Sequence, residues 1–209
     1  ITIKQIVPCE DDSSMFEIFS RLNSGGVMLR PQEIRMSIYY SPFYETLVSE
    51  LNSNKTWRKF VGKNEPDLHM GDIEVLVRAF AMLDMADKYK SPLKIFLNGF
   101  SKKAMKFTKE EIENCSRIFN EFCESCNSLS EDAFRNDKNK FVISLFEAVF
   151  VAVCEKIKEE GTKNKRITND SFNQLKKDTS FAEASQGSTA SAGSVKIRLE
   201  RAHAIIELK

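Results

Sequence analysis

The sequence predicts a mainly α-helical protein, a multi-helix bundle preceded by one short N-terminal strand. Three observations support this class. After residue 30, apolar residues recur at intervals of three and four, the spacing of one helix face. Helix-start signals precede several of these stretches, as in the capping box from Thr108 to Glu111. The run "FVISLFEAVFVAVC" at 141–154 is apolar nearly all round, which predicts a helix of about 140–160 at the centre of the bundle.

Composition agrees with an ordinary soluble domain. The 209 residues are 42% hydrophobic and 29% charged, which excludes disordered and membrane classes. The longest apolar run is interrupted by Glu147 and is shorter than the ~20 residues of a membrane span. A net charge of +1 offers no global attraction to nucleic acid. Five cysteines, an odd number in a chain of this length, predict a reduced, cytoplasmic setting.

The N-terminal elements are short. "ITIKQIV" alternates polar and apolar residues and predicts a strand, the last of a sheet whose other strands are missing; with Ile1 in place of Met, we expect a fragment. The "DDSS" cluster then caps a helix of about ten residues, which Gly25 and Gly26 end. Pro31 begins the next helix, which we expect to continue past a kink at Ser41-Pro42.

The remaining chain alternates helices with short connections. One expected loop, "SFAEASQGSTASAGS" at 180–194, is rich in small polar residues. A helix that starts at Ser91-Pro92 should end near Asn98-Gly99. The other expected helices cover 72–89, 108–126, 168–178 and 195–208.

Most reactive residues have a plain structural explanation. Cys123 and Cys126 fall on the apolar stripe of their own helix, and no second pair supplies the four ligands of a zinc site, so we favour core packing. His69 and His203 stand alone, which excludes a His-rich metal site, and we expect them to be exposed or locally hydrogen-bonded. No phosphate-binding loop or nucleophile elbow occurs, so catalytic residues are unassigned.

Arg78 interrupts the apolar stretch "VLVRAFAML", and a buried guanidinium demands a carboxylate or carbonyl partner. Glu74, one turn earlier, could serve. Arg78 then either locks two helices together or faces a ligand, and Glu147 in the central helix raises the same question.

The stretch "SRLNSGGVMLRPQEIR" at 20–35 allows two interpretations. It is either a tight helix-turn-helix corner in which Gly25 and Gly26 adopt positive φ, or an anion site. In the second case, backbone N–H groups and the following helix N-terminus face the anion, while Arg21 and Asn23 hold it. The residue types alone leave both open.

The pattern F-x-x-x-x-R-L-N-S-G-G-x-x-L-x-x-Q-E-I-R, Phe16 to Arg35, closely resembles the signature of GmrSD-type restriction and phage-defence proteins, whose N-terminal domain is ParB-like. The rest of the chain fits that family more loosely. The resemblance implies that residues 1–30 end a ParB-like domain and that 31–209 form a helical domain. It also implies a missing β-rich half with an Asp-Gly-x-x-Arg motif for NTP hydrolysis. The family's activity is NTP-dependent DNA cleavage, and this chain alone is expected to be inactive.

By this resemblance, Arg21 and Asn23 would face nucleotide phosphates and Gly25 and Gly26 would shape the turn. Residues Glu33, Arg35 and Arg78 would be structural or ligand-facing. The cofactor would be an NTP with Mg²⁺ in the full-length protein and none in this chain alone, with no metal ligands of its own. Expected partners are the missing half, a nuclease domain, DNA and a second copy of the chain; no membrane is expected.

Two other functions stay open. One is an all-helical protein-interaction module with a purely architectural Gly-Gly corner. The other is a bundle that binds DNA directly through basic clusters, either Lys55, Arg58, Lys59 and Lys63 or Lys163, Lys165 and Arg166.

Overall fold

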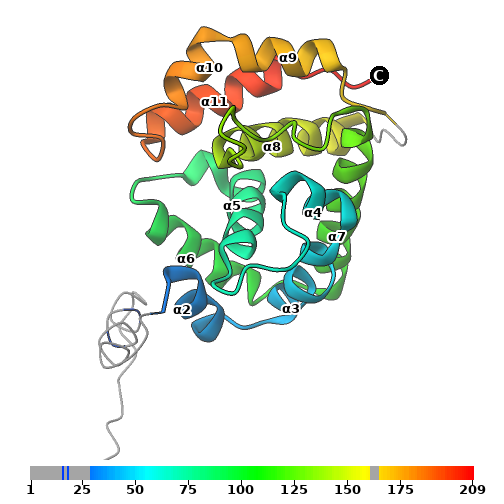
Figure 1. Ribbon diagram of the computed structural model, residues 1–209. Coiled ribbons are helices and arrows are strands. Elements are labelled where there is room, and N and C mark those ends of the chain that lie inside the picture. The colour runs from blue at the N-terminus through cyan, green and yellow to red at the C-terminus, as the bar shows by residue number, and fades with distance from the viewer. Residues whose placement is uncertain (1–15, 17, 19–28, 161–164) are drawn as a thin grey trace, which may run out of the picture.

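Helices pack on helices throughout the part of the chain that the structure, a computed structural model, describes: residues 16, 18, 29–160 and 165–209 (Figure 1). The predicted class, a mainly α-helical multi-helix bundle, is confirmed. Within these residues, strand pairing is limited to two isolated bridges, Arg135 with Phe141 and Ile167 with Leu208. The predicted N-terminal strand and most of the first predicted helix lie outside the described residues.

The centre of the bundle is α8 (Ile143–Glu160), as its sequence predicts. It packs against α5 (Gly71–Met85), α7 (Lys109–Ser125) and α11 (Ala192–Ile205), and Figure 1 shows it between α11 and α5. Aromatic rings fill the space around it, with Phe146 and Phe150 each contacting Phe122 edge to face. Such packing explains the run of apolar residues on every face of α8.

Two helices form where one kinked helix is predicted. The chain leaves α2 (Pro31–Ile38) and begins α3 (Pro42–Ser49) only after a break, with Ser41 in extended conformation. The reason is local, because a residue before proline is forced out of the helical region and proline suits the first turn of a new helix. A 3-10 turn (Leu51–Ser53) leads into α4 (Lys55–Val61), whose first turn is capped by the Asn54 side chain.

The helix predicted to end near Asn98-Gly99 continues. After a short 3-10 turn (Ala86–Lys88), α6 spans Leu93–Ala104. Phe100 and Ala104 are buried in the core, so packing outweighs the poor helix propensity of glycine. A Cβ at Gly99 would meet no atom within 4 Å, so no close contact requires a glycine at this position.

The C-terminal layer contains α9 (Asn169–Lys177), α10 (Thr179–Ala184) and α11, which lie along one side of α8 (Figure 1). The loop predicted for 180–194 is therefore wrong at both ends. Asp178 caps α10 by accepting a hydrogen bond from the backbone N–H of Phe181, and the Phe181 ring is buried. The cap and the buried ring together stabilise a helix in a segment whose small polar residues predict a loop.

The cysteines of the described part belong to the core. Cys123 and Cys126 are buried, which confirms the packing role predicted for them; η4 (Cys126–Ser128) follows α7 directly. Cys154 is buried beside them and Cys115 is half-buried, and all four are free thiols. No helix among the described residues has the length and apolar character that crossing a membrane requires.

Candidate functional site

The residues predicted to form a site fall into three groups. Arg21, Asn23, Gly25 and Gly26 lie outside the described residues. Glu33 and Arg35 lie on α2, and Arg78 lies on α5 with its side chain toward α8. Of the predicted site residues, the structure thus describes two at the C-terminal end of the signature and one separate arginine.

Glu33 serves the start of its own helix. Its Oε2 accepts from the backbone N–H of Arg30 at 2.5 Å, and its Oε1 lies 3.3 Å from Nδ1 of His69. The backbone hydrogen bond from Arg30 is the main reason why the pKa of Glu33 lies below its usual value, with the His69 side chain adding to it. The carboxylate therefore caps the first turn of α2 and links it to the loop before α5, so His69 is locally partnered as predicted.

Arg35 is buried and ties three helices together. Its guanidinium donates to the side-chain oxygen of Gln32 on α2, to Oδ1 of Asn98 on α6 at 3.2 Å, and to Oε2 of Glu74 on α5 at 3.4 Å. The Nε2 of Gln32 is also buried and has no hydrogen-bond partner. Of the two roles left open for Arg35, structural and ligand-facing, the structural one matches this buried environment with three side-chain partners.

The first signature residue reaches the same corner. Phe16 is buried, with its ring centroid 6.2 Å from that of Tyr39, the residue after α2. The Nζ of Lys94 on α6 lies 4.9 Å from the centre of the Phe16 ring, within cation–π range. Phe16 and Arg35, the two ends of the signature, therefore both contact α6, Phe16 through Lys94 and Arg35 through Asn98.

Arg78 does not pair with Glu74, the partner suggested by helical spacing. Its Nε donates to Oε2 of Glu147 on α8, while Glu74 turns to Arg35. The other oxygen of Glu147 lies 3.4 Å from Nη2 of Arg198 on α11. Packing of α5 on α8 brings the buried carboxylate closer than the same-helix alternative, a pairing that helical spacing within α5 could not identify.

In the first proposed basic cluster, the one between residues 55 and 63, the arginine lies in the interior of the protein. Arg58 is buried, and its Nη1 donates to Oδ1 of Asn52 at 3.0 Å and to Oδ2 of Asp72 at 2.7 Å. The indole N–H of Trp57 donates to the same Asn52 oxygen at 2.9 Å. Sequence reasoning missed this network, because "KTWRKF" has the composition of a basic run and nothing local assigns Arg58 to the interior.

The neighbouring lysines of that cluster are paired on the surface. Lys59 forms a 2.7 Å ion pair with Glu131, and Lys63 forms one of 2.8 Å with Asp67. Lys55 is exposed. In the second cluster, Lys163 lies outside the described residues. Local pairing thus removes most of the positive charge that DNA binding through 55–63 requires.

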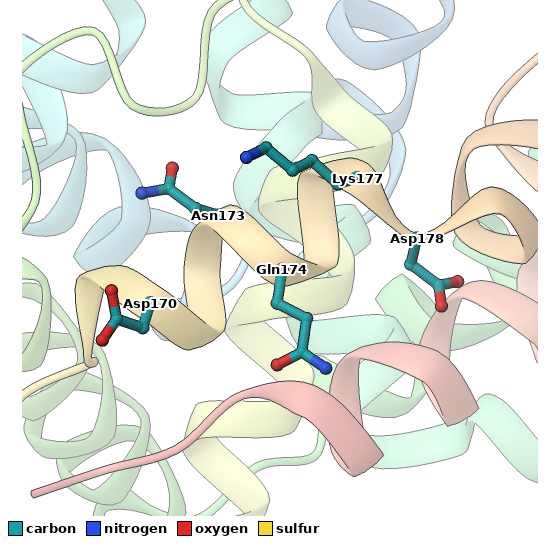
Figure 2. A pocket seen from close by; sticks show the side chains of 5 residues that line it. All are labelled: Asp170, Asn173, Gln174, Lys177 and Asp178. Carbon is teal, nitrogen blue, oxygen red and sulfur yellow. The ribbon is translucent and has the colours of Figure 1, made fainter.

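A polar hollow of roughly 490 Å³ lies over α9 (Figure 2). Asn173 and Lys177 point to one side of the helix, whereas Gln174 points to the other, so these groups do not converge. Asp178, at its end, is bound by Arg201 through Nε and Nη2. Among the described residues no group of histidine, cysteine and acidic side chains is placed to hold a metal ion.

Within the described residues, the geometry around α2 brings Phe16 and Arg35 to one corner and shows no nucleophile paired with a base. Its polar groups are occupied with one another, apart from the Gln32 amide nitrogen. No protein-family model, curated protein or solved structure matches this chain.

Proposed function

We propose that this chain is the helical part of a ParB-related defence protein similar to the GmrSD type, and that it holds the signature turn as one wall of a nucleotide-phosphate site. The nucleotide, bound with Mg²⁺ and shared with a β-rich half, would control DNA cleavage by a nuclease domain. One observation carries the proposal: Phe16 and Arg35, the two ends of the signature, are anchored in one corner of the bundle.

Anchoring of both ends restricts the turn between them. Phe16 belongs to the core cluster and Leu29 packs against the same cluster. A preorganised turn binds an anion without losing its ordering entropy again. Arg21, Asn23 and the amides around Gly25 and Gly26 would then meet the phosphates together.

The test is calorimetric titration of each nucleoside triphosphate with Mg²⁺ into this chain and into a longer protein that adds a β-rich half. Arg21→Ala is compared with Arg117→Ala, a matched loss of charge at a surface ion pair on α7. We expect binding in the longer protein that Arg21→Ala weakens by tenfold or more, about the effect of one charge-assisted hydrogen bond. Equal binding by both variants, or none in the longer protein, would reject the phosphate site.

A protein-interaction module is the second candidate, and exposed apolar side chains around the same corner favour it. Tyr40 follows α2 and is 59% exposed, Ile95 on α6 is 64% exposed, and Leu68 is 92% exposed beside His69. Under this alternative, Gly25→Ala lowers stability and changes no nucleotide affinity. The same titration separates the two functions.

A further inference from the structure

A cavity of roughly 180 Å³ lies where α5, α6, α7 and α8 meet. Its floor and inner wall are apolar and consist of three phenylalanines, a leucine and an isoleucine: Phe80, Leu83, Phe100, Phe107 and Ile118. Phe80, Phe100 and Ile118 are buried, so the floor belongs to the core. The polar lining residues are exposed and form the rim: Asp84, Glu111, Asn114 and Lys158. An apolar floor below a few polar groups is the usual form of a small-molecule site.

A fourth phenylalanine holds the three rings of the cavity in place. Phe43 contacts Phe80, Phe100 and Phe107 edge to face, with centroid distances of 5.8, 5.6 and 5.5 Å. The Phe43 ring is buried and does not line the cavity itself. Because core packing fixes the rings, a ligand would not have to order them on binding.

The floor of the cavity suits an apolar group better than water. Its side chains offer no hydrogen-bond donor or acceptor, whereas a well-held water needs two to four polar partners. An apolar group that displaces loosely held water gains affinity. An apolar cavity of about 150 Å³ holds one benzene ring. A cavity of roughly 180 Å³ therefore has room for one six-membered ring with a short substituent.

The charges at the rim balance one another. Asp84 pairs with Nζ of Lys103 at 2.6 Å, and Glu111 accepts from the backbone N–H of Thr108 at 2.7 Å. Lys158 forms no ion pair within the part of the chain that the structure describes. Two carboxylates thus face two ammonium groups, so a charged ligand would meet no excess of the opposite charge. The ammonium of Lys158 still has N–H groups to donate.

The wall between the floor and the rim contains the half-buried Cys115. Burial raises the pKa of its thiol to about 11; the charge of Lys158 lowers this pKa, and those of Asp84 and Glu111 raise it. Three charges of the rim therefore act on one sulfur atom in the wall. A molecule bound in the cavity would cover that sulfur, so the reactivity of Cys115 reports occupancy.

We propose that this cavity binds a small, uncharged aromatic molecule, whose ring lies on the phenylalanine floor and whose one hydrogen-bond acceptor meets Nζ of Lys158. Edge-to-face contacts between rings add to the affinity that apolar burial provides. The site goes beyond the function proposed above, because none of its lining residues belongs to the signature or to α2.

The first experiment measures alkylation of Cys115 by iodoacetamide in the whole chain at pH 8, followed by peptide mass spectrometry. Benzamide is the uncharged probe, and benzoate and benzamidine are its negative and positive matches of similar shape. We expect benzamide to slow the alkylation several-fold in a saturable way. The charged matches should need at least about tenfold higher concentrations, because their charges lose hydration without gaining a partner. No protection by benzamide, or equal protection by either charged compound, would overturn the proposal.

Variants then test the rim and the floor separately. Lys158→Met removes the donor, so the benzamide concentration that half-protects Cys115 should rise about two- to tenfold, the effect of one hydrogen bond. Lys156→Met, on the same helix but outside the cavity lining, should not change it. Leu83→Trp fills the cavity and should abolish the benzamide effect; if this variant fails to fold, Lys158→Met decides. An unchanged half-protecting concentration in Lys158→Met, or continued protection in folded Leu83→Trp, would contradict the site.

Discussion

Whether a charged side chain of this protein is buried or exposed depends on the partners that the fold gives it, and not on its residue type alone. Arg35, Arg58 and Arg198 are all buried, and each donates to groups on other helices or loops. Asp67 shows the same behaviour near the surface. It accepts from Nζ of Lys63 at 2.8 Å and from the backbone N–H of His69 at 2.9 Å. Its charge is therefore linked to the conformation of the loop before α5.

The Asp67→Asn variant tests that link through pH. Lys63 and the backbone N–H bonds lower the pKa of Asp67 from 3.8 to about 2. A lowered pKa in the folded state means that the charge stabilises the fold above pH 3.8 and that this contribution is lost as pH falls through about 2. Because Lys63 is largely exposed, we expect the substitution to cost only about 1 kcal/mol in the free energy of unfolding at pH 7, and clearly less at pH 2, where much of the Asp67 carboxyl is protonated in the folded and the unfolded chain.

Urea unfolding at both pH values measures this difference. The asparagine side chain keeps an oxygen for the backbone N–H groups, so the change isolates the charge. Asp137→Asn, in an exposed loop, is the control and should leave stability unchanged at either pH. A loss of equal size at pH 7 and pH 2 would show that Asp67 acts through its shape and not through its charge.

At the level of elements, helix ends depend on contacts from distant parts of the chain. The end of α4 is an example: Gly62 follows it with a left-handed φ of +74°, and its N–H reaches the carbonyls of Arg58 and Lys59. Arg135, from the segment before α8, then donates to the carbonyls of Lys59 and Phe60. Local capping and a long-range guanidinium thus satisfy the same helix end.

Two glycine-to-alanine changes should act in opposite directions. Gly62→Ala places a Cβ on a left-handed residue and within 2.6 Å of the Arg135 guanidinium, so we expect a loss of about 1–2 kcal/mol in unfolding free energy. Gly99→Ala lies inside α6 in open space and should add up to ~1 kcal/mol. Chemical denaturation of both variants beside the parent chain measures the two effects, and a stabilised Gly62→Ala would contradict this account of the helix end.

Across the whole molecule, one aromatic core unites the helices, and its thiols report on its integrity. Burial raises the pKa of the Cys123, Cys126 and Cys154 thiols, and it raises that of half-buried Cys115 to about 11. Thiolate is the reactive form, so burial and raised pKa should both slow reaction with a thiol reagent.

Labelling with a chromogenic disulfide at pH 8 tests the core, in a Cys9→Ser background because Cys9 lies outside the described residues. We expect the three buried thiols to react at least about 10³-fold more slowly than in the unfolded chain, since they become accessible only on opening of the core. The same protein in denaturant supplies the reference rate. Fast reaction of all three in the folded protein would mean that α7 and α8 do not pack as described.

Local sequence signals identify most of the helices but not all of their ends. The capping box at Thr108 and the apolar run of α8 predict their helices directly, because caps and periodicity act within a few residues. The same reasoning predicts an end of α6 that is too early and predicts a loop in place of α10. In both places the burial of a phenylalanine, Phe100 or Phe181, stabilises a helix that glycine or small polar residues disfavour. Packing energy comes from other helices, so no local pattern contains it.

Local patterns in the chain were enough to predict the helical class, the central helix and the core packing of Cys123 and Cys126. The ion pairs depend on the packing of helices from distant parts of the chain, which brings both Arg78 and Arg198 to Glu147 and leaves Glu74 to Arg35. Residue spacing ranks partners along one helix, whereas a buried charge pairs with the carboxylate that neighbouring helices bring to it. That difference in range explains why the bundle could be predicted from the chain and its polar junctions could not.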